Sequence, residues 1–179
     1  MQTSLEKNFF ELFGLPARFE LDTSDLALRY RELQRRFHPD RFAAATDQER
    51  RLSLQITAQI NQGFQTLKEP LSRGRYLLAL RGVSTDEDTD TAMDPGFLME
   101  QMELRESLDD ARHSQQRSVR LAQLAQKADA LLRDRTQALR KTFADDFAGA
   151  ATRARELIRE MQFLKKLAAE IQELEEAEQ

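Results

Sequence analysis

The chain has 179 residues, of which 27 are basic and 31 acidic, and it contains two histidines and no cysteine. Without cysteine, the sequence excludes a disulfide framework, a thiolate zinc site, a cysteine-ligated iron-sulfur cluster and a cysteine nucleophile. Its apolar runs are only a few residues long, far below the roughly 20 that a membrane-spanning helix needs, so we expect no association with a membrane. The first ten residues carry no secretory signal, and we expect the protein in the cytosol.

Charge differs between the two halves of the chain. Residues 1–82 hold 13 basic and 10 acidic side chains, whereas residues 83–179 hold 14 and 21. Halves of opposite net charge suggest two different partners. The sequence is rich in Leu, Ala, Glu, Gln and Arg, with only six glycines and four prolines, and this composition favours helices throughout. We therefore expect an all-α protein.

An acidic linker is predicted between two domains. Residues 84–94, STDEDTDTAMD, are acidic and rich in threonine and show no hydrophobic period, as is typical of a linker. The segment follows Gly82, a typical helix stop, and ends at Asp94 and Pro95, which suit the start of a helix. The predicted organisation is an N-terminal domain over 1–82, a linker over 83–96 and a C-terminal domain over 97–179.

The N-terminal domain is predicted to contain an antiparallel pair of helices. Periodic apolar residues predict helices over 8–13, over 25–37, and from a capping box at 46–49 to a stop at 70. Because a proline ends the second of these helices, His38, Pro39 and Asp40 are expected to be exposed in the loop between the two long helices.

Basic side chains lead up to this His-Pro-Asp loop. By itself, the tripeptide is an ordinary polar turn. The helix before it, however, carries Arg29, Arg31, Arg35 and Arg36, with Glu32 as the only acid among them. The plain interpretation of such a run is a solvated helix face. Next to the loop, we favour the alternative of a docking surface for an acidic partner.

Three segments resemble, in order and spacing, a J domain, the module that stimulates ATP hydrolysis by heat-shock chaperones of the DnaK class. They are NFFELFGL at 8–15, FHPDRF at 37–42, and the stretch from IN at 60–61 to LKEPLSR at 67–73. The resemblance implies that His38, Pro39 and Asp40 switch the chaperone's ATPase. The docking residues that it implies are Arg29, Arg35, Arg36 and Arg41. The sequence lacks the Gly/Phe-rich stretch and zinc repeats of general protein-folding J proteins, which indicates one dedicated client.

The first helix of the C-terminal domain, over 97–113, is predicted to have two apolar faces. One stripe is assigned to a bundle core and consists of Phe97, Leu104, Leu108 and Ala111. The opposite side carries Leu98, Met99 and Met102, bordered by Glu103, Glu106 and Asp110. This second face is either buried against the N-terminal domain or exposed as a methionine-containing partner surface. We favour the exposed surface, because methionine suits adaptable binding.

Two further helices, over 118–143 and 146–176, complete a predicted three-helix bundle. Phe163 lies off the apolar stripe of the last helix. A phenylalanine at such a position either packs at a helix end or is exposed. If exposed, it joins the patch of Leu98, Met99 and Met102, because the first and third helices of a bundle are neighbours.

The segments FLMEQMELRE at 97–106 and FLKKL at 163–167 resemble the C-terminal domain of the HscB family, the J-protein co-chaperones of iron-sulfur cluster biogenesis. The resemblance implies that the bundle binds the iron-sulfur cluster scaffold protein, of IscU type, and delivers it to an HscA-type chaperone. The scaffold-binding residues that it implies are Leu98, Met99, Met102, Glu103, Glu106, Asp110 and Phe163. Because the sequence shows no cysteine-rich extension, a bacterial, cytoplasmic form is expected.

Other functional classes find little support in the sequence. His38 and His113 stand without a catalytic constellation, and the sequence contains no phosphate-binding loop, so we expect neither an enzyme nor a resident metal or cofactor. The acidic second half argues against nucleic acid as a partner. The alternative that stays open is a J protein that recruits a DnaK-class chaperone to a different dedicated client.

Overall fold

A computed structural model describes residues 7–85, 94–144 and 147–177. Every regular element in these ranges is a helix, which confirms the predicted all-α fold. The chain divides into two compact units, Met1–Leu77 and Leu78–Gln179. The division falls inside helix α4 (Pro70–Leu80), shortly before the predicted domain boundary, and most of the predicted linker lies outside the described residues.

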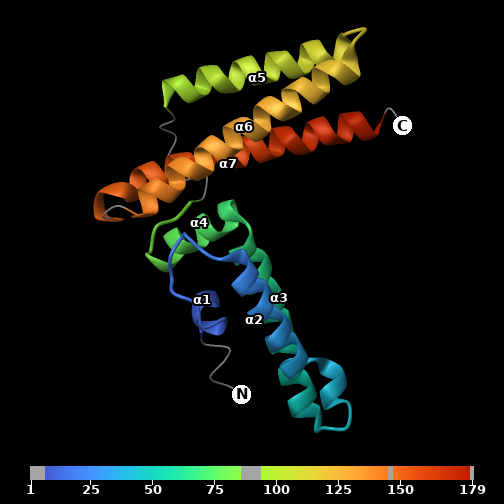
Figure 1. Cartoon of the computed structure of the whole chain (residues 1–179), viewed down its shortest axis with the longest axis vertical. Helices are drawn as coiled ribbons and strands as arrows, with labels where there is room; N and C mark the ends of the chain where they lie inside the picture. Colours follow the sequence, from blue (N-terminus) through green and yellow to red (C-terminus); the bar gives the residue numbers. More distant parts are fainter. Residues whose placement is uncertain (1–6, 86–93, 145–146, 178–179) are drawn as a thin grey trace. The chain divides into compact units, whose positions relative to one another are not determined.

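The N-terminal unit is built on two long helices that lie side by side (Figure 1). Its elements are α1 (Phe9–Leu12), α2 (Thr23–Phe37), the 3-10 helix η2 (Pro39–Phe42), α3 (Asp47–Lys68) and the first part of α4. Helices α2 and α3 are the predicted antiparallel pair, and η2 lies in the loop between them. The predicted capping box of α3 is present, because Thr46 and Glu49 each accept a hydrogen bond from the other's backbone N–H.

The apolar stripes of α2 and α3 form the core of this unit. The buried members are Leu26 and Phe37 from α2 and Ile56, Ile60 and Leu67 from α3. At the edge of the core, Tyr30 stacks on Phe64 with ring centroids 4.2 Å apart, and its hydroxyl donates to Asn61 Oδ1 at 3.0 Å. The Ile-Asn motif therefore helps to join the two helices.

Helix α1 packs against α3 at a glycine. A β-carbon at Gly63 would lie 3.0 Å from the nearest ring atom of Phe9 and 3.1 Å from the ring of Phe13. The glycine therefore gives the two rings the room that a methyl group would occupy. The backbone N–H of Phe9 also donates to the Tyr76 hydroxyl at 2.8 Å, and burial raises the pKa of Tyr76.

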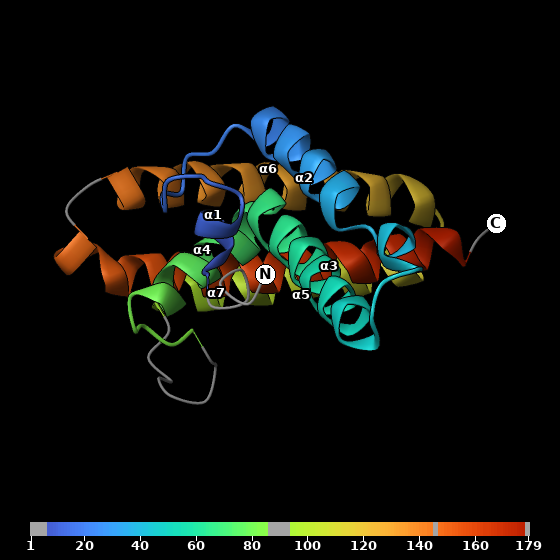
Figure 2. The same cartoon turned by 90° about the horizontal axis from the view of Figure 1, so that it is seen from below.

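The C-terminal unit consists of α5 (Pro95–His113), α6 (Arg117–Ala144) and α7 (Phe147–Glu176), which confirms the predicted three-helix bundle. Helices α6 and α7 lie side by side, and α5 forms a hairpin with α6 (Figures 1 and 2). Helix α5 starts as predicted, because the Asp94 side chain accepts a hydrogen bond from Gly96 N at 3.4 Å and Pro95 occupies the first turn.

The predicted core stripe of α5 is buried in this bundle. All four of its residues, Phe97, Leu104, Leu108 and Ala111, are at most 5% exposed. The last three pack in a cluster with Leu121, Leu124 and Ala128 of α6 and Leu164, Leu167 and Ile171 of α7. One side of α5 therefore supplies the core of the bundle.

Candidate functional site

The His-Pro-Asp loop is exposed and has a defined local geometry. His38 caps the C-terminus of α2, and Pro39 opens η2 with the fixed φ that suits a first helical position. The backbone N–H of Asp40 donates to His38 Nδ1 at 3.3 Å, and the Asp40 carboxylate lies 3.4 Å from the same nitrogen. The His38 side chain is 52% exposed and that of Asp40 is 89% exposed. Both polar groups are thus presented to solvent on a short, structured turn.

The backbone carbonyls at this end of α2 are held by hydrogen bonds. The Phe37 carbonyl accepts from Ser53 Oγ at 2.9 Å and from Thr57 Oγ1 at 3.0 Å. The Arg35 carbonyl accepts from Arg41 Nη1 at 3.1 Å. Our sequence reasoning missed Ser53 and Thr57. The sequence did hold a signal for Ser53, which lies seven residues before a core isoleucine and so on the buried side of the helix. A buried hydroxyl needs a hydrogen-bond partner.

The predicted docking arginines do not all face solvent in the same way. Arg35, Arg36 and Arg41 are exposed beside the loop. Arg29 instead has an internal role: its Nε pairs with Asp25 at 3.0 Å, and its Nη1 donates to the carbonyls of residues 13 and 14 at 3.0 and 3.1 Å. Arg29 thus ties the end of α1 to α2, and the docking role of Arg29, Arg35, Arg36 and Arg41 stays a prediction.

Within the C-terminal unit, the bundle leaves the second face of α5 exposed. Leu98, Met99 and Met102 have exposed fractions of 43%, 66% and 72%. The predicted acidic neighbours Glu103, Glu106 and Asp110 are exposed as well. We call these six residues the α5 face. It combines apolar contact area with negative charge along one helix, which suits a partner that carries apolar and basic groups.

The structure places Phe163 between the two alternatives that the sequence left open. It is half-buried and packs against the core cluster. Its ring meets Phe97 edge-to-face with centroids 5.8 Å apart, and the Arg105 guanidinium lies 5.5 Å from its centroid. The sequence pattern missed this because helical angles show which side of α7 carries Phe163, but not that a neighbouring arginine covers the ring.

Ion pairs fix α5 to the other two helices of its unit. On one flank, Glu100 pairs with Arg135 of α6 at 2.7 Å, and Arg135 also pairs with the buried Glu160 of α7. On the other flank, Glu170 of α7 accepts from Arg105 and from Arg112, each at 2.5 Å. A buried carboxylate such as Glu160 is costly unless it is paired. These contacts keep the backbone under the α5 face in place.

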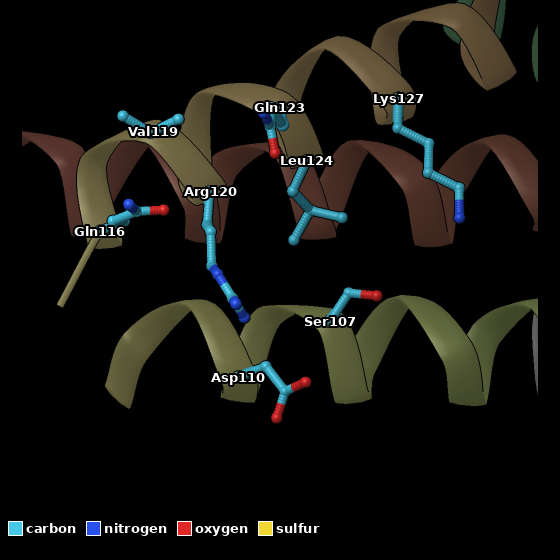
Figure 3. A pocket seen from close by; sticks show the side chains of 8 residues that line it. All are labelled: Ser107, Asp110, Gln116, Val119, Arg120, Gln123, Leu124 and Lys127. Atoms are coloured by element: carbon cyan, nitrogen blue, oxygen red, sulfur yellow. The ribbon is translucent and has the colours of Figure 1, made fainter. Parts of the chain in front are cut away.

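A polar groove of about 470 Å³ runs between α5 and α6 beside the acidic edge of the α5 face. It is lined by Ser107 and Asp110 of α5 and by Val119, Arg120 and Lys127 of α6, among others. Figure 3 shows the Arg120 side chain extending from α6 toward α5. Because the groove is open and its walls carry charges of both signs, it suits the polar edge of a partner surface better than an enclosed apolar ligand.

The described ranges contain no group of three or more acidic or histidine side chains arranged to hold a metal ion. Within the same ranges, the helices are too short or too polar to cross a bilayer.

Known proteins share this architecture. The C-terminal unit matches the family model of the HSCB C-terminal oligomerisation domain over residues 93–172. A co-chaperone protein HscB homolog from Shewanella baltica is 44% identical over 170 residues, which cover 95% of this chain and 98% of that relative. The chain belongs to the HscB co-chaperone family. The match extends over both units, so the N-terminal unit is the J domain of an HscB-type protein.

Solved structures of the family agree with this assignment. The chaperone HscB from Vibrio cholerae superimposes with a TM-score of 0.82 at 40% identity, over 97% of this chain and all of that one. The human co-chaperone protein HscB gives a TM-score of 0.84 at 30% identity, over 93% of this chain and 81% of that one. In both, an N-terminal J domain precedes a C-terminal helical bundle, as it does here.

Proposed function

We propose that this HscB-family protein is an adaptor that binds an iron-sulfur cluster scaffold protein of IscU type and delivers it to an HscA-type chaperone. The C-terminal bundle binds the scaffold through the α5 face. The J domain binds the ATP-loaded chaperone and stimulates its ATPase through the His-Pro-Asp loop. ATP hydrolysis is carried out by the chaperone, so the adaptor itself is not an enzyme. It assists the maturation of iron-sulfur proteins, and we place this role in the bacterial cytoplasm.

The observation that carries the proposal is the pairing of two unlike exposed surfaces in one chain. Leu98, Met99 and Met102 are apolar side chains that the bundle does not bury, and His38 and Asp40 are polar groups on a structured turn. Large apolar side chains that gather on an exposed helix face mark an interaction site. Membership of the HscB family and the resemblance of residues 97–106 and 163–167 to its bundle support the scaffold as the occupant.

The α5 face is expected to gain most of its binding free energy from the apolar residues. Burial of a large side chain at the centre of an interface contributes more than a charge at its rim, and rim charges act chiefly on the association rate. Phe163 takes part when the scaffold contacts its exposed edge or displaces Arg105 from the ring. The acidic residues Glu103, Glu106 and Asp110 attract a basic surface on the scaffold.

Joining the two surfaces in one chain raises the local concentration of scaffold at the chaperone. A tethered ligand acts at an effective concentration in the millimolar range when the linker allows both sites to bind. The loop then favours the chaperone conformation that hydrolyses ATP. The adaptor thereby couples scaffold capture to hydrolysis.

A single-turnover ATPase assay with an HscA-type chaperone tests this proposal. Scaffold and adaptor together should accelerate hydrolysis more than the sum of their separate effects. The Leu98→Ala, Met99→Ala, Met102→Ala triple variant should stimulate hydrolysis as well as the wild type when the scaffold is absent. It should lose the extra acceleration that scaffold and adaptor give together. The control Leu54→Ala truncates an exposed leucine of the J domain and should behave like the wild type. Purely additive effects of the wild type would contradict the adaptor and favour a J protein with a different client.

A further inference from the structure

Two hydroxyl groups of α3 hold the carbonyl that immediately precedes the His-Pro-Asp loop. Ser53 Oγ and Thr57 Oγ1 lie 2.9 and 3.0 Å from the Phe37 carbonyl oxygen and donate to it. Ser53 is fully buried and Thr57 is half-buried. A carbonyl oxygen has two lone pairs, so these two donors satisfy it completely.

The Phe37 carbonyl depends on these donors because the helix ends there. The last carbonyls of a helix have no donor within it. In a continuing helix the N–H of Arg41 would reach Phe37, but here it donates to the carbonyl of His38 at 3.0 Å. Pro39 has no N–H at all. The chain therefore turns into the loop at a carbonyl that two hydroxyls of α3 satisfy.

We propose that Ser53 and Thr57 are positioning residues for the His-Pro-Asp loop. By fixing the Phe37 carbonyl they fix the last peptide plane of α2, and this plane sets the direction in which the His38 and Asp40 side chains leave the turn. The inference rests on the proposed function, because this direction matters only when the loop acts on a chaperone. Ser53 is buried, so it acts through the loop and not by touching the partner.

This role has a kinetic signature that differs from that of a docking residue. Loss of the hydroxyls lets the loop sample other orientations, so a smaller fraction of bound complexes has the stimulating one. The exposed Arg35 and Arg36 side chains make no hydrogen bond to either hydroxyl. Loss of the hydroxyls should therefore lower the maximal stimulation of the ATPase. The adaptor concentration needed for half-maximal stimulation should stay nearly unchanged.

Four variants isolate the hydroxyl groups. Ser53→Ala and Thr57→Val each remove one hydroxyl with little change in shape, and they can be combined. Thr57→Ser removes a methyl group and keeps the donor. Thr66→Val is the matched control on α3, since the Thr66 hydroxyl makes no hydrogen bond within the described part of the chain.

The first readout is single-turnover ATP hydrolysis by an HscA-type chaperone as the variant is titrated. We expect each single loss to lower maximal stimulation about fivefold, the effect of one net hydrogen bond, and the double variant to lower it further. The half-saturating concentration should change by less than about twofold. Thr57→Ser and Thr66→Val should match the wild type.

The second readout is hydrogen exchange of backbone amides. In the double variant, the amides of Arg41 and Ala43, which donate to the carbonyls of His38 and Asp40, should exchange faster. The amide of Ile60 in the middle of α3 should keep its protection. A change confined to the loop separates a loss of positioning from a general loss of stability.

Each outcome decides between the possibilities. Full stimulation by the double variant would overturn the positioning role and leave the proposed function standing. A loss of stimulation that comes only together with the protection of Ile60 would do the same. A wild-type chain that does not stimulate the chaperone overturns the proposed function and this inference with it. Asp40→Asn, measured alongside, defines the signal of an inactive loop.

Discussion

In the J domain the exposed His38 and Asp40 stand on a turn whose flanking carbonyls are hydrogen-bonded, whereas in the bundle the exposed Leu98, Met99 and Met102 stand on an ordinary helix face. The first surface is small, polar and held in one geometry. The second is larger, apolar and made of flexible side chains. The difference fits the two proposed roles: fixed polar groups suit an action on a chaperone's conformation, and adaptable contact area suits the holding of a client.

The largest effect is expected from a change in the His-Pro-Asp loop. Asp40→Asn keeps the shape of the side chain and removes its charge beside His38, so we expect stimulation of the chaperone ATPase to be lost. Scaffold binding should be unchanged, because the proposed scaffold site lies in the other unit. Single-turnover hydrolysis measures the first effect and calorimetry the second. Stimulation equal to that of the wild type would show that the loop does not act on the chaperone.

The next largest effect is expected on the α5 face. The Leu98→Ala, Met99→Ala, Met102→Ala triple variant removes most of its apolar area, and we expect scaffold affinity to fall about 100-fold. Helicity should be unchanged, since the core stripe of α5 is untouched. Calorimetry measures the affinity, with Leu54→Ala as the control for loss of an exposed leucine. Unchanged affinity would mean that the scaffold binds at a site other than the α5 face.

Reversing charge on the docking face should have an intermediate effect. Arg35→Glu combined with Arg36→Glu should raise the half-saturating adaptor concentration in the ATPase assay about tenfold, because an acidic partner is then repelled. Arg133→Glu combined with Arg140→Glu, at two exposed sites on α6, changes the net charge equally and should have no effect. The difference should shrink as salt is added. If maximal stimulation fell while the half-saturating adaptor concentration stayed the same, these arginines would help the loop to stimulate the ATPase and would not serve docking.

Neutralising the acidic rim of the α5 face should weaken scaffold binding by only a few-fold. Glu103→Gln, Glu106→Gln and Asp110→Asn leave the apolar centre intact, so the main change should be a slower association that depends less on salt. Stopped-flow kinetics measures this rate, with Glu173→Gln on α7 as the control. A loss as large as that of the apolar variant would mean that charge, and not apolar area, dominates the interface.

The smallest effect concerns the start of α3. Hydrogen bonds from the side chain and backbone of Thr46 hold the pKa of Glu49 below its ordinary value. The charged carboxylate therefore stabilises the folded state above its ordinary pKa, and this contribution is lost as the pH falls through the lowered pKa. Glu49→Ala should lower the unfolding temperature slightly at pH 7 and not at strongly acidic pH. If Glu49→Ala lowered the unfolding temperature equally at pH 7 and at strongly acidic pH, the carboxylate charge would not be the source of the stabilisation.

Much of the fold was predictable because its apolar residues recur at helical spacing. The core stripe of α5 and the capping box at Thr46 and Glu49 were found at their positions, and the exposure of Leu98, Met99 and Met102 followed from their angle around the helix. The motifs at 37–42 and 97–106 identified the family. Such features are local, so a single segment of sequence carries them.

The parts that escaped prediction depend on contacts between distant segments. Arg29 looks like its exposed neighbours in the sequence, yet it bonds to carbonyls that lie 15 and 16 residues away. Phe163 is covered by Arg105 from another helix. Ser53 and Thr57 hold a carbonyl of α2 across the loop. Helical periodicity tells which side of a helix a residue occupies, but not which polar groups of another helix meet it there.

The measurement that tests the central claim most directly is calorimetric titration of the iron-sulfur scaffold protein into three forms of this chain. These are the wild type, Asp40→Asn, and the Leu98→Ala, Met99→Ala, Met102→Ala variant. The two-surface account predicts equal affinity for the first two and loss of binding by the third. Absence of binding to the wild type, or equal binding by all three, would contradict it.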